Sequence, residues 1–268
     1  MNRDFIEQYW DASIYEQTEN QTHDVEFILK VLNEQLGNTS QKLLEIACGA
    51  GRISVPLAQV GYDVTGIDVN EHMLLRCYRR MKGIPNINMR CYCGDVTKVD
   101  LGSDYDVVVL ASNVLINIET EMDYKQAQIM FINKAAQASK SGGHFYLSFN
   151  LLYNPSAVYN SSKESHYFDG GTDEMGTYGR TCSYGSVYDP VTQICSGANH
   201  TELTTNNGEQ IIVPRLWYKH IPTQSQVYEW LDDAGFIIER TYKNFTDEPF
   251  PQPIDESCYE ITIWARKK

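Results

Sequence analysis

Strand-length apolar runs alternate with helix-like segments over the first 150 residues of this 268-residue chain. The first two runs are "KLLEIAC" and "YDVTGIDV", and the segments between runs place apolar residues at helical spacing. Such alternation predicts a parallel sheet that helices cover on both faces. We expect strands at 42–48, 62–69, 87–93, 104–112 and 143–150, and helices at 51–61, 70–83 and 119–143.

The pattern changes after residue 150, where several segments read as antiparallel strands separated by turn residues. A helical pattern capped by Thr223 and closed by Gly235 follows, and two more strand-like runs end the chain. We therefore expect a core made of residues 1–150 and 222–268, with residues 151–221 inserted as a small antiparallel sheet that acts as a lid.

The first predicted strand leads into "ACGAGR", which places Ala47, Gly49 and Gly51 between a strand and a helix. Small residues let the backbone turn sharply and approach a ligand closely. Ligands of open parallel sheets bind at the carboxyl ends of the strands, so this turn is the expected site. A dinucleotide fingerprint that starts at Gly49 meets Ser54 where Gly or Ala is required, which disfavours a nucleotide-dependent oxidoreductase.

Four ordered motifs resemble those of the class I S-adenosylmethionine-dependent methyltransferases. "LLEIACGAGR" is similar to the family's "LDLACGTGR", "VTGIDVNEHML" to "GvDxSxxML", "CGDVTKVD" to its adenine-side motif, and "HIPTQSQVYEWLDDAGFIIERTY" to "TPEELxxLLxxAGF". The resemblance covers nearly the whole chain. It implies an α/β, Rossmann-like fold: a seven-stranded, mainly parallel sheet in the order 3-2-1-4-5-7-6, with an antiparallel last strand.

The resemblance also implies a site for S-adenosyl-L-methionine at the ends of the first three strands. Asp68 ends the second strand, 19 residues beyond Gly49, where a carboxylate can accept both ribose hydroxyls. Asp95 and the backbone N–H of Val96 would contact the adenine, although Asp is also a preferred helix cap. Family precedent assigns the methionine end to the glycine turn and to Tyr9 or Tyr15 of the N-terminal helix. The implied cofactor residues are Tyr15, Glu45, Ala47, Gly49, Gly51, Arg52, Asp68, Val69, Met73, Asp95, Val96 and Ser112.

Arg52 also has a simpler interpretation, as a surface residue of the first helical turn.

Contacts to the methyl acceptor are expected at the ends of the fourth and fifth strands and in the insertion. The segment "ASNVLINI" resembles the family's "xxNSLxHL", which makes Ser112, Asn113 and Asn117 candidates. The catalytic candidates are Asn113, Asn150 and His220; further candidates are Tyr153, Tyr178, Tyr184, His200 and Trp217.

A sulfonium methyl is an activated electrophile, so aligning the acceptor and excluding water are the protein's main tasks. The chain lacks the "NPPY" or "DPPY" motif of enzymes that methylate the amino groups of bases or of glutamine. The inserted sheet resembles the lids of enzymes that methylate small amines, although the sequence does not choose between nitrogen and oxygen. We expect methyl transfer to a small-molecule acceptor; the alternative is a catalytically silent regulatory protein that binds the cofactor.

The formal charge of −13 disfavours nucleic acid as a partner, and no apolar run is long enough for a membrane span. The polar N-terminus does not resemble a secretory signal, so we expect a cytoplasmic protein, either a monomer or a homodimer. Seven cysteines without a C-x-x-C pair predict reduced thiols. Cys91 and Cys93 lack the further ligands of the usual metal site, so no metal is expected.

Overall fold

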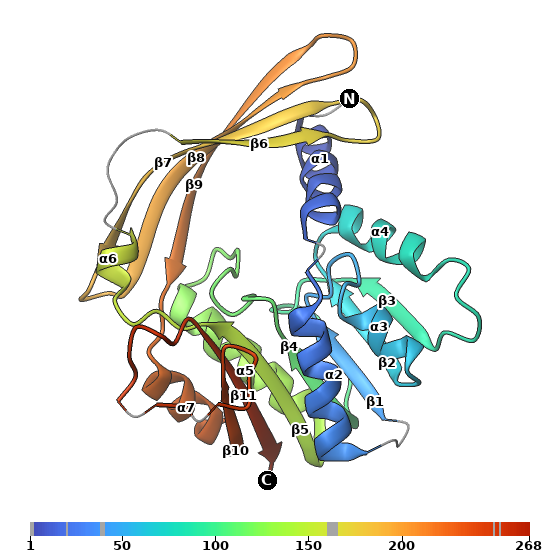
Figure 1. Ribbon diagram of the computed structural model, residues 1–268, viewed down its shortest axis with the longest axis vertical. Helices are drawn as coiled ribbons and strands as arrows, with labels where there is room; N and C mark the ends of the chain where they lie inside the picture. Colours follow the sequence, from blue (N-terminus) through green and yellow to red (C-terminus); the bar gives the residue numbers. More distant parts are fainter. Residues whose placement is uncertain (1–2, 20, 38–40, 160–165, 249, 252) are drawn as a thin grey trace. The chain divides into compact units, whose positions relative to one another are not determined.

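The computed structural model describes residues 3–19, 21–37, 41–159, 166–248, 250–251 and 253–268. The chain divides into two compact units (Figure 1). Unit 1 contains Met1–Asn20 and Asn154–Ile221, and unit 2 contains Gln21–Tyr153 and Pro222–Lys268. Residues 160–165 of the predicted insertion lie outside the described residues. The N-terminal segment, which we expected in the core, groups with the insertion, whose role as a lid stays a prediction.

Seven strands form the sheet of unit 2, in the order β10-β11-β5-β4-β1-β2-β3. β11 is antiparallel to both of its neighbours, and the other neighbouring strands are parallel. Without the strands of the insertion, this order is 3-2-1-4-5-7-6, so the predicted topology with an antiparallel last strand is confirmed. The bounds are β1 Lys42–Ile46, β2 Asp63–Asp68, β3 Met89–Cys93, β4 Tyr105–Leu110, β5 Ser139–Asn150, β10 Phe236–Lys243 and β11 Glu260–Lys267.

The central strands are buried on both faces, as their continuous apolar sequences predict. The start of β5 differs from the prediction, because the strand begins at Ser139 whereas we expected a helix up to residue 143. A Cβ atom at Gly143 would lie 2.9 Å from the carbonyl oxygen of Tyr105. This glycine therefore lets β5 approach β4 closely, where the register between the two strands shifts.

The helices of unit 2 are α2 His23–Leu36, α3 Ser54–Gln59, α4 Glu71–Met81, α5 Tyr124–Ala138 and α7 Gln224–Asp233. Helices α2 and α3 pack with Tyr146 and Trp264 in one core cluster, whereas α5 and α7 lie on the opposite face of the sheet (Figure 1). A capping box of Thr223 and Gln226 begins α7, which confirms the predicted cap. Asn70 caps α4 by accepting hydrogen bonds from two backbone N–H groups.

Unit 1 is a four-stranded antiparallel sheet in the order β6-β7-β8-β9, with helix α1 packed on it. Its elements are α1 Arg3–Thr18, α6 Pro155–Tyr159, β6 His166–Thr172, β7 Tyr178–Asp189, β8 Ile194–Thr204 and β9 Gln210–His220. The Trp10 indole is 3% exposed and donates a hydrogen bond to the Gly171 carbonyl oxygen over 3.1 Å. Gly170 and Gly179 make room for this ring, because a Cβ atom at either position would lie 2.3 Å from it.

The packing of Trp10 predicts a large effect for Gly179→Ala. The added methyl would overlap the indole ring, so we expect the free energy of unfolding to fall by about 1–3 kcal/mol. Thermal and urea denaturation would measure the loss. In a Trp10→Ala background the same substitution should cost much less, since the ring is gone. Equal costs in the two backgrounds would contradict this account of the helix–sheet contact.

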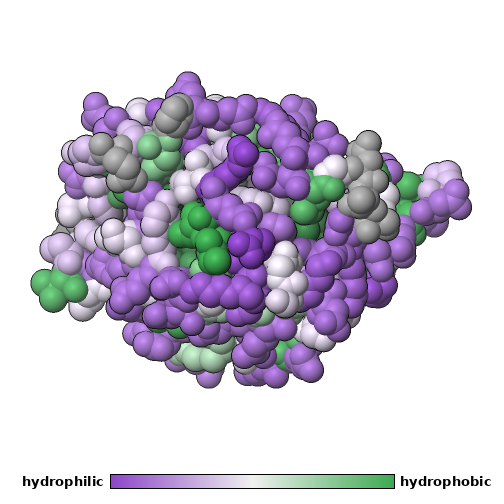
Figure 2. All heavy atoms as spheres, turned by 90° about the horizontal axis from the view of Figure 1, so that it is seen from below, coloured by the Kyte–Doolittle hydropathy of each residue, from purple (hydrophilic) through white to green (hydrophobic). Residues whose placement is uncertain are grey.

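Hydrophilic residues predominate on the face that Figure 2 shows, with hydrophobic residues in smaller groups between them. The view looks at the molecule from below relative to Figure 1. Among the helices of the described ranges, none combines the length and the apolar character needed to cross a membrane.

Candidate active site

The glycine turn joins β1 to α3 in a left-handed backbone conformation. The φ angles are 60° at Ala47, 53° at Gly49 and 75° at Gly51. Ala47 adopts this conformation at a cost of about 1–2 kcal/mol relative to an ordinary one, whereas glycine does so freely. A Cβ atom at Gly51 would also lie 2.6 Å from the Cys77 sulfur, so this position requires glycine for two reasons.

Asp68, the last residue of β2, binds the glycine turn directly. The backbone N–H of Gly49 donates to Oδ2 over 2.8 Å, and the N–H of Asn70 donates to Oδ1 over 2.8 Å. Burial raises the pKa of Asp68, whereas the hydrogen bonds from Asn70 and Gly49 oppose that rise. A carboxylate oxygen can accept two hydrogen bonds, so each oxygen retains capacity for one hydroxyl of a ribose diol. This carboxylate therefore fits the cofactor role that the sequence predicts.

Val69 and Met73 follow Asp68 in the same motif. Val69 is exposed, and the half-buried Met73 packs close to the glycine turn, 3.3 Å from where a Cβ atom of Gly49 would lie. The Met73 side chain thus lies beside the turn, as expected for a neighbour of a bound adenosine. Direct contact with the cofactor stays a prediction.

Glu45 lies in β1 below the turn and is 4% exposed. The Ser54 hydroxyl donates a hydrogen bond to its carboxyl group, which ties β1 to the start of α3. Burial raises the pKa of Glu45 to about 8, although Ser54 and the charge of Arg52 act in the opposite direction. Glu45 therefore stabilises the glycine turn through its buried hydrogen bond to Ser54. A direct contact between Glu45 and the cofactor stays a prediction.

Arg52 forms a partly buried ion pair, whereas its simpler interpretation expected a residue at the surface. Both Nη atoms lie 2.6 Å from the Asp24 carboxylate, one on each oxygen, and the side chain is 13% exposed. Arg52 also donates to the Gln21 carbonyl oxygen over 3.2 Å and to the Ser112 hydroxyl over 2.8 Å. It therefore connects the glycine turn to the start of α2 and to the end of β4. If Arg52 also binds the methionine carboxylate of the cofactor, as predicted, its guanidinium would bind that carboxylate and Asp24 at the same time.

Asp95 caps the turn that follows β3. Its carboxylate accepts hydrogen bonds from the N–H and hydroxyl of Thr97, over 2.9 and 2.6 Å, and pairs with Lys98 at 2.9 Å. The Lys98 hydrogen bond, followed by that of Thr97, lowers the pKa of Asp95 to about 2. The capping role is thus what the structure shows. The adenine contacts of Asp95 and of the adjacent Val96, whose side chain is buried, stay predictions.

The ends of β4 and β5 meet through Asn113. Ser112 and Asn113 have φ angles of 55° and 63°, which are unusual for residues other than glycine. The Asn113 Oδ1 atom accepts a hydrogen bond from the Asn150 N–H over 3.0 Å, and Asn150 lies opposite Glu260 of β11. Two hydrogen bonds, from Arg52 to Ser112 and from Asn150 to Asn113, therefore lie at the edge where the parallel strands end.

The remaining candidates are distributed over both units. Tyr9, Tyr15, Tyr178, Tyr184, His200, Trp217 and His220 belong to unit 1, whereas Asn117 and Tyr153 belong to unit 2. His220 lies at the end of β9 and is 2% exposed, and Tyr15 is half-buried in α1. The roles of these residues at an active site stay predictions.

Asp24 and Glu260 are two acidic groups near this site that the sequence analysis did not identify. Glu260 is 5% exposed, and burial, with a further contribution from the charge of Asp24, raises its pKa to about 8. Only the tertiary structure brings Asp24 to Arg52, since 28 residues separate them. The sequence does contain one signal for Glu260, because an acidic residue begins the apolar run of the last predicted strand.

The cysteines near the turn are packed in the core rather than arranged for metal binding. Cys48, Cys77 and Cys91 belong to one buried cluster, and hydrogen bonds between the thiols, followed by burial, raise the pKa values of Cys77 and Cys91. Cys93, by contrast, is exposed. Within the part of the chain that the structure describes, no group of three or more His, Cys, Asp or Glu residues is placed to hold a metal ion.

Comparison with known proteins shows which family the domain that contains this site resembles. Residues 43–143 match the sequence family described as Methyltransferase domain. A putative methyltransferase of Geobacillus sp. (strain WCH70) is 24% identical over 230 residues, which cover 83% of this chain and 84% of that protein. Residues 43–143 therefore form a methyltransferase domain of the S-adenosylmethionine-dependent class I.

Two solved structures share the fold of this methyltransferase. An S-adenosylmethionine-dependent methyltransferase from Clostridium acetobutylicum ATCC 824 aligns with a TM-score of 0.71 at 13% identity, covering 95% of this chain and 96% of that one. The sugar N-methyltransferase KedS8 from Streptoalloteichus sp. ATCC 53650 aligns with a TM-score of 0.67 at 14% identity, covering 95% and 91%. The similarity extends over both units.

The position of Asp68 predicts its contribution to cofactor binding. Asp68→Ala should weaken the binding of S-adenosyl-L-methionine by about 1.5–3 kcal/mol, the range for losing hydrogen bonds to a charged group. Isothermal titration of the folded variant would measure this change. Asp63→Ala is the matched control, because Asp63 begins the same strand and pairs with Arg90 at 3.3 Å. Equal affinity in both variants would remove Asp68 from the site.

The buried carboxyl of Glu260 predicts a pH dependence of stability. Its pKa rises from 4.5 to about 8 on folding, so the folded chain binds more protons than the unfolded chain between these values. The contribution of Glu260 to stability therefore falls as the pH rises through this window, by up to about 1.4 kcal/mol per pH unit.

Glu260→Gln removes this titration. We expect the free energy of unfolding of the variant to increase relative to the wild type between pH 5 and pH 8, as measured by urea denaturation at several pH values. Other titrating groups, including Glu45, remain in both proteins and cancel in the comparison. A difference that does not change with pH would contradict a raised pKa at Glu260.

Proposed function

We propose that this methyltransferase transfers the methyl group of S-adenosyl-L-methionine to a small-molecule acceptor, with amines as the leading class and hydroxyl compounds as the alternative. The observation that carries the proposal is the Asp68 carboxylate, which the Gly49 and Asn70 amides orient at the end of β2 with capacity left for a diol. The fold shared with a sugar N-methyltransferase supports an amine acceptor. The net charge of −13 argues against nucleic acid.

Bound S-adenosyl-L-methionine supplies a methyl group that the sulfonium sulfur has already activated. The acceptor lone pair forms a bond to the methyl carbon while the bond between sulfur and carbon breaks, and a protonated acceptor must also lose a proton. The protein therefore has to fix the ribose through Asp68, hold the acceptor in line and exclude water. No dedicated base is required for an acceptor that arrives unprotonated.

Asn113 and Asn150 are our leading candidates for holding the acceptor. Asn150 ends β5 and Asn113 lies in the turn after the adjacent strand β4, and the hydrogen bond between them fixes the orientation of the Asn113 amide. Its NH2 group can donate to an acceptor oxygen, and the exposed Asn150 side chain offers a second polar group. The proposed roles of Tyr15 and His220 depend on the predicted lid function of residues 151–221. A cytoplasmic location, and a monomer or homodimer, also stay predictions from the sequence.

A screen of small amines and hydroxy compounds for the formation of S-adenosylhomocysteine tests the proposed reaction. For the best acceptor, Asn113→Gly should lower kcat/KM at least about tenfold, the effect of misplacing a reacting group, without changing cofactor affinity. Glycine keeps the left-handed backbone of this position. The matched control is Asn86→Gly, because Asn86 also has a positive φ, 56°, and is exposed in the loop before β3.

The outcomes of this screen separate the alternatives. Cofactor binding without turnover on any acceptor would support a catalytically silent regulatory protein. Equal losses of activity in the two asparagine variants would show that Asn113 is not part of the acceptor site. Tight binding of a nicotinamide dinucleotide would instead favour a nucleotide-dependent oxidoreductase.

A further inference from the structure

The buried carboxyl of Glu260 lies at the edge of unit 2 where β5 ends. Glu260 begins β11 and lies directly opposite Asn150, the last residue of β5. Directly opposed residues of antiparallel strands point to the same face, with Cβ atoms about 4.5–5.5 Å apart. Asn150 is exposed, and its backbone N–H holds the Asn113 amide. An ionisable group is therefore a neighbour of the residues that we propose for the acceptor.

The surroundings of Glu260 leave its charge uncompensated. Within the described ranges, no Lys, Arg or His forms an ion pair with this carboxyl. Arg52, a cation of the same edge, is bound to Asp24 by two hydrogen bonds of 2.6 Å. Burial, and then the charge of Asp24, raise the pKa of Glu260 from its usual 4.5 to about 8. Glu260 is therefore a much stronger base than an ordinary carboxylate.

Two tyrosines on the same face of the sheet do not compete for this role. Tyr146 of β5 interacts with the charge of Glu260, and Tyr242 of β10 lies opposite Thr262, two residues along β11 from Glu260. Burial raises the pKa values of both phenols above the ordinary value of 10. Both tyrosines are therefore neutral over the range in which Glu260 titrates.

An amine acceptor needs a base if it arrives as an ammonium ion. The ammonium nitrogen has no lone pair, so it cannot form a bond to the methyl carbon until it has lost a proton. Proton transfer is most efficient when the pKa of the base lies near the operating pH, which an ordinary glutamate does not satisfy. Glu260 combines a suitable basicity with a position beside Asn150.

We propose that Glu260 is the base that accepts a proton from the ammonium group of an amine held at Asn113 and Asn150. This inference rests on the proposed function and narrows it to acceptors that arrive protonated. The Glu260 carboxylate takes one ammonium proton and becomes neutral, which leaves the lone pair on nitrogen. The lone pair forms the bond to the methyl carbon while the bond between sulfur and carbon breaks. The product leaves as a methylated ammonium ion, and Glu260 then returns its proton to solvent.

The pH profile of kcat/KM tests this role, with the best amine of the acceptor screen whose own pKa exceeds that of Glu260 by at least about one unit. Transfer in the wild type requires an ionised Glu260 and a protonated amine. The value of kcat/KM should therefore rise up to about pH 8 and then level off until the amine itself loses its proton.

Glu260→Gln should change both the size and the shape of this profile. Only the small neutral fraction of the amine can then react, so kcat/KM at the pH where the wild type levels off should be at least about tenfold lower. It should continue to rise about tenfold per pH unit up to the pKa of the amine, where the wild type is level. Glu260→Asp keeps a carboxyl and should retain a profile that levels off.

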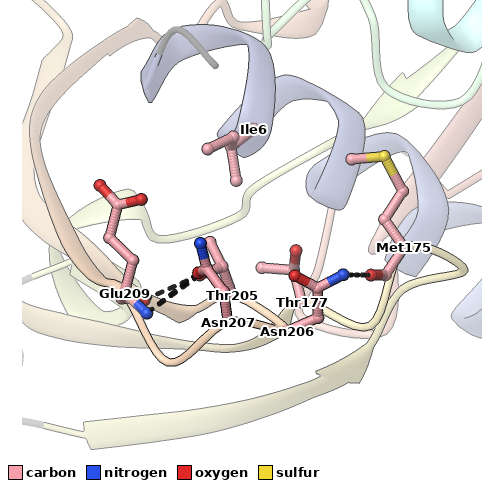
Figure 3. A pocket seen from close by; sticks show the side chains of 7 residues that line it. All are labelled: Ile6, Met175, Thr177, Thr205, Asn206, Asn207 and Glu209. Carbon is pink, nitrogen blue, oxygen red and sulfur yellow. Dashed lines mark hydrogen bonds between the residues drawn. The ribbon is translucent and has the colours of Figure 1, made fainter.

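Glu209→Gln is the matched control. Glu209 is an exposed carboxylate of unit 1 that lines a pocket of about 180 Å³ together with Ile6 and Met175 (Figure 3). This variant makes the same chemical change at another carboxylate that a ligand could reach, and it should keep the wild-type profile. A wild-type profile in Glu260→Gln, or equal effects of the two substitutions, would overturn the proposed base.

Two further outcomes separate the base from the proposed function. Formation of S-adenosylhomocysteine with hydroxyl compounds alone would overturn the base but leave methyl transfer to a small molecule intact, whereas no formation with any acceptor would overturn both. Cofactor affinity and the circular dichroism spectrum should be unchanged in Glu260→Gln. Loss of cofactor affinity in this variant would indicate a structural role for Glu260 and would also overturn the base.

Discussion

The Asp68 carboxylate joins the two backbone segments that form the predicted cofactor site. One oxygen receives the N–H of the turn after β1, and the other receives the N–H at the start of α4. Because β1 and β2 are parallel neighbours, their carboxyl ends lie at one edge, where a short side chain can reach both segments. Gly49 and Gly51 adopt left-handed angles in this turn without strain because they lack a Cβ atom.

Acidic residues collect around this edge, and each has a different environment. Burial raises the pKa values of Glu45 and Glu260 to about 8, so both carboxyls are mainly neutral near pH 7. The charge of Asp24 is compensated by Arg52 in a two-point ion pair. Asp68, in contrast, is held by neutral amides. The uncompensated negative charge of the site is therefore placed where a cationic sulfonium cofactor would benefit from it.

Much of this arrangement could be predicted from the sequence, because its signals are local. Continuous apolar runs identified the strands, and the glycine turn with Asp68 predicts the edge at which the cofactor binds. Local signals failed where a partner is distant in sequence, as for Arg52 and Asp24. They also failed at Gly143, which we expected at the end of a helix. This glycine instead lies within β5, where the missing Cβ atom allows a close contact with the backbone of β4.

The composition of unit 1 from two distant segments has a consequence for how the chain is made. Helix α1 is synthesised first, yet Trp10 packs against glycines near residue 171, which follow 161 residues later. At ordinary elongation rates this separation corresponds to roughly 10–30 s. During that interval the apolar side of α1, including Ile6 and Trp10, has no native surface to cover it. Helix α1 therefore keeps an apolar face exposed until the strands that bury it have been synthesised.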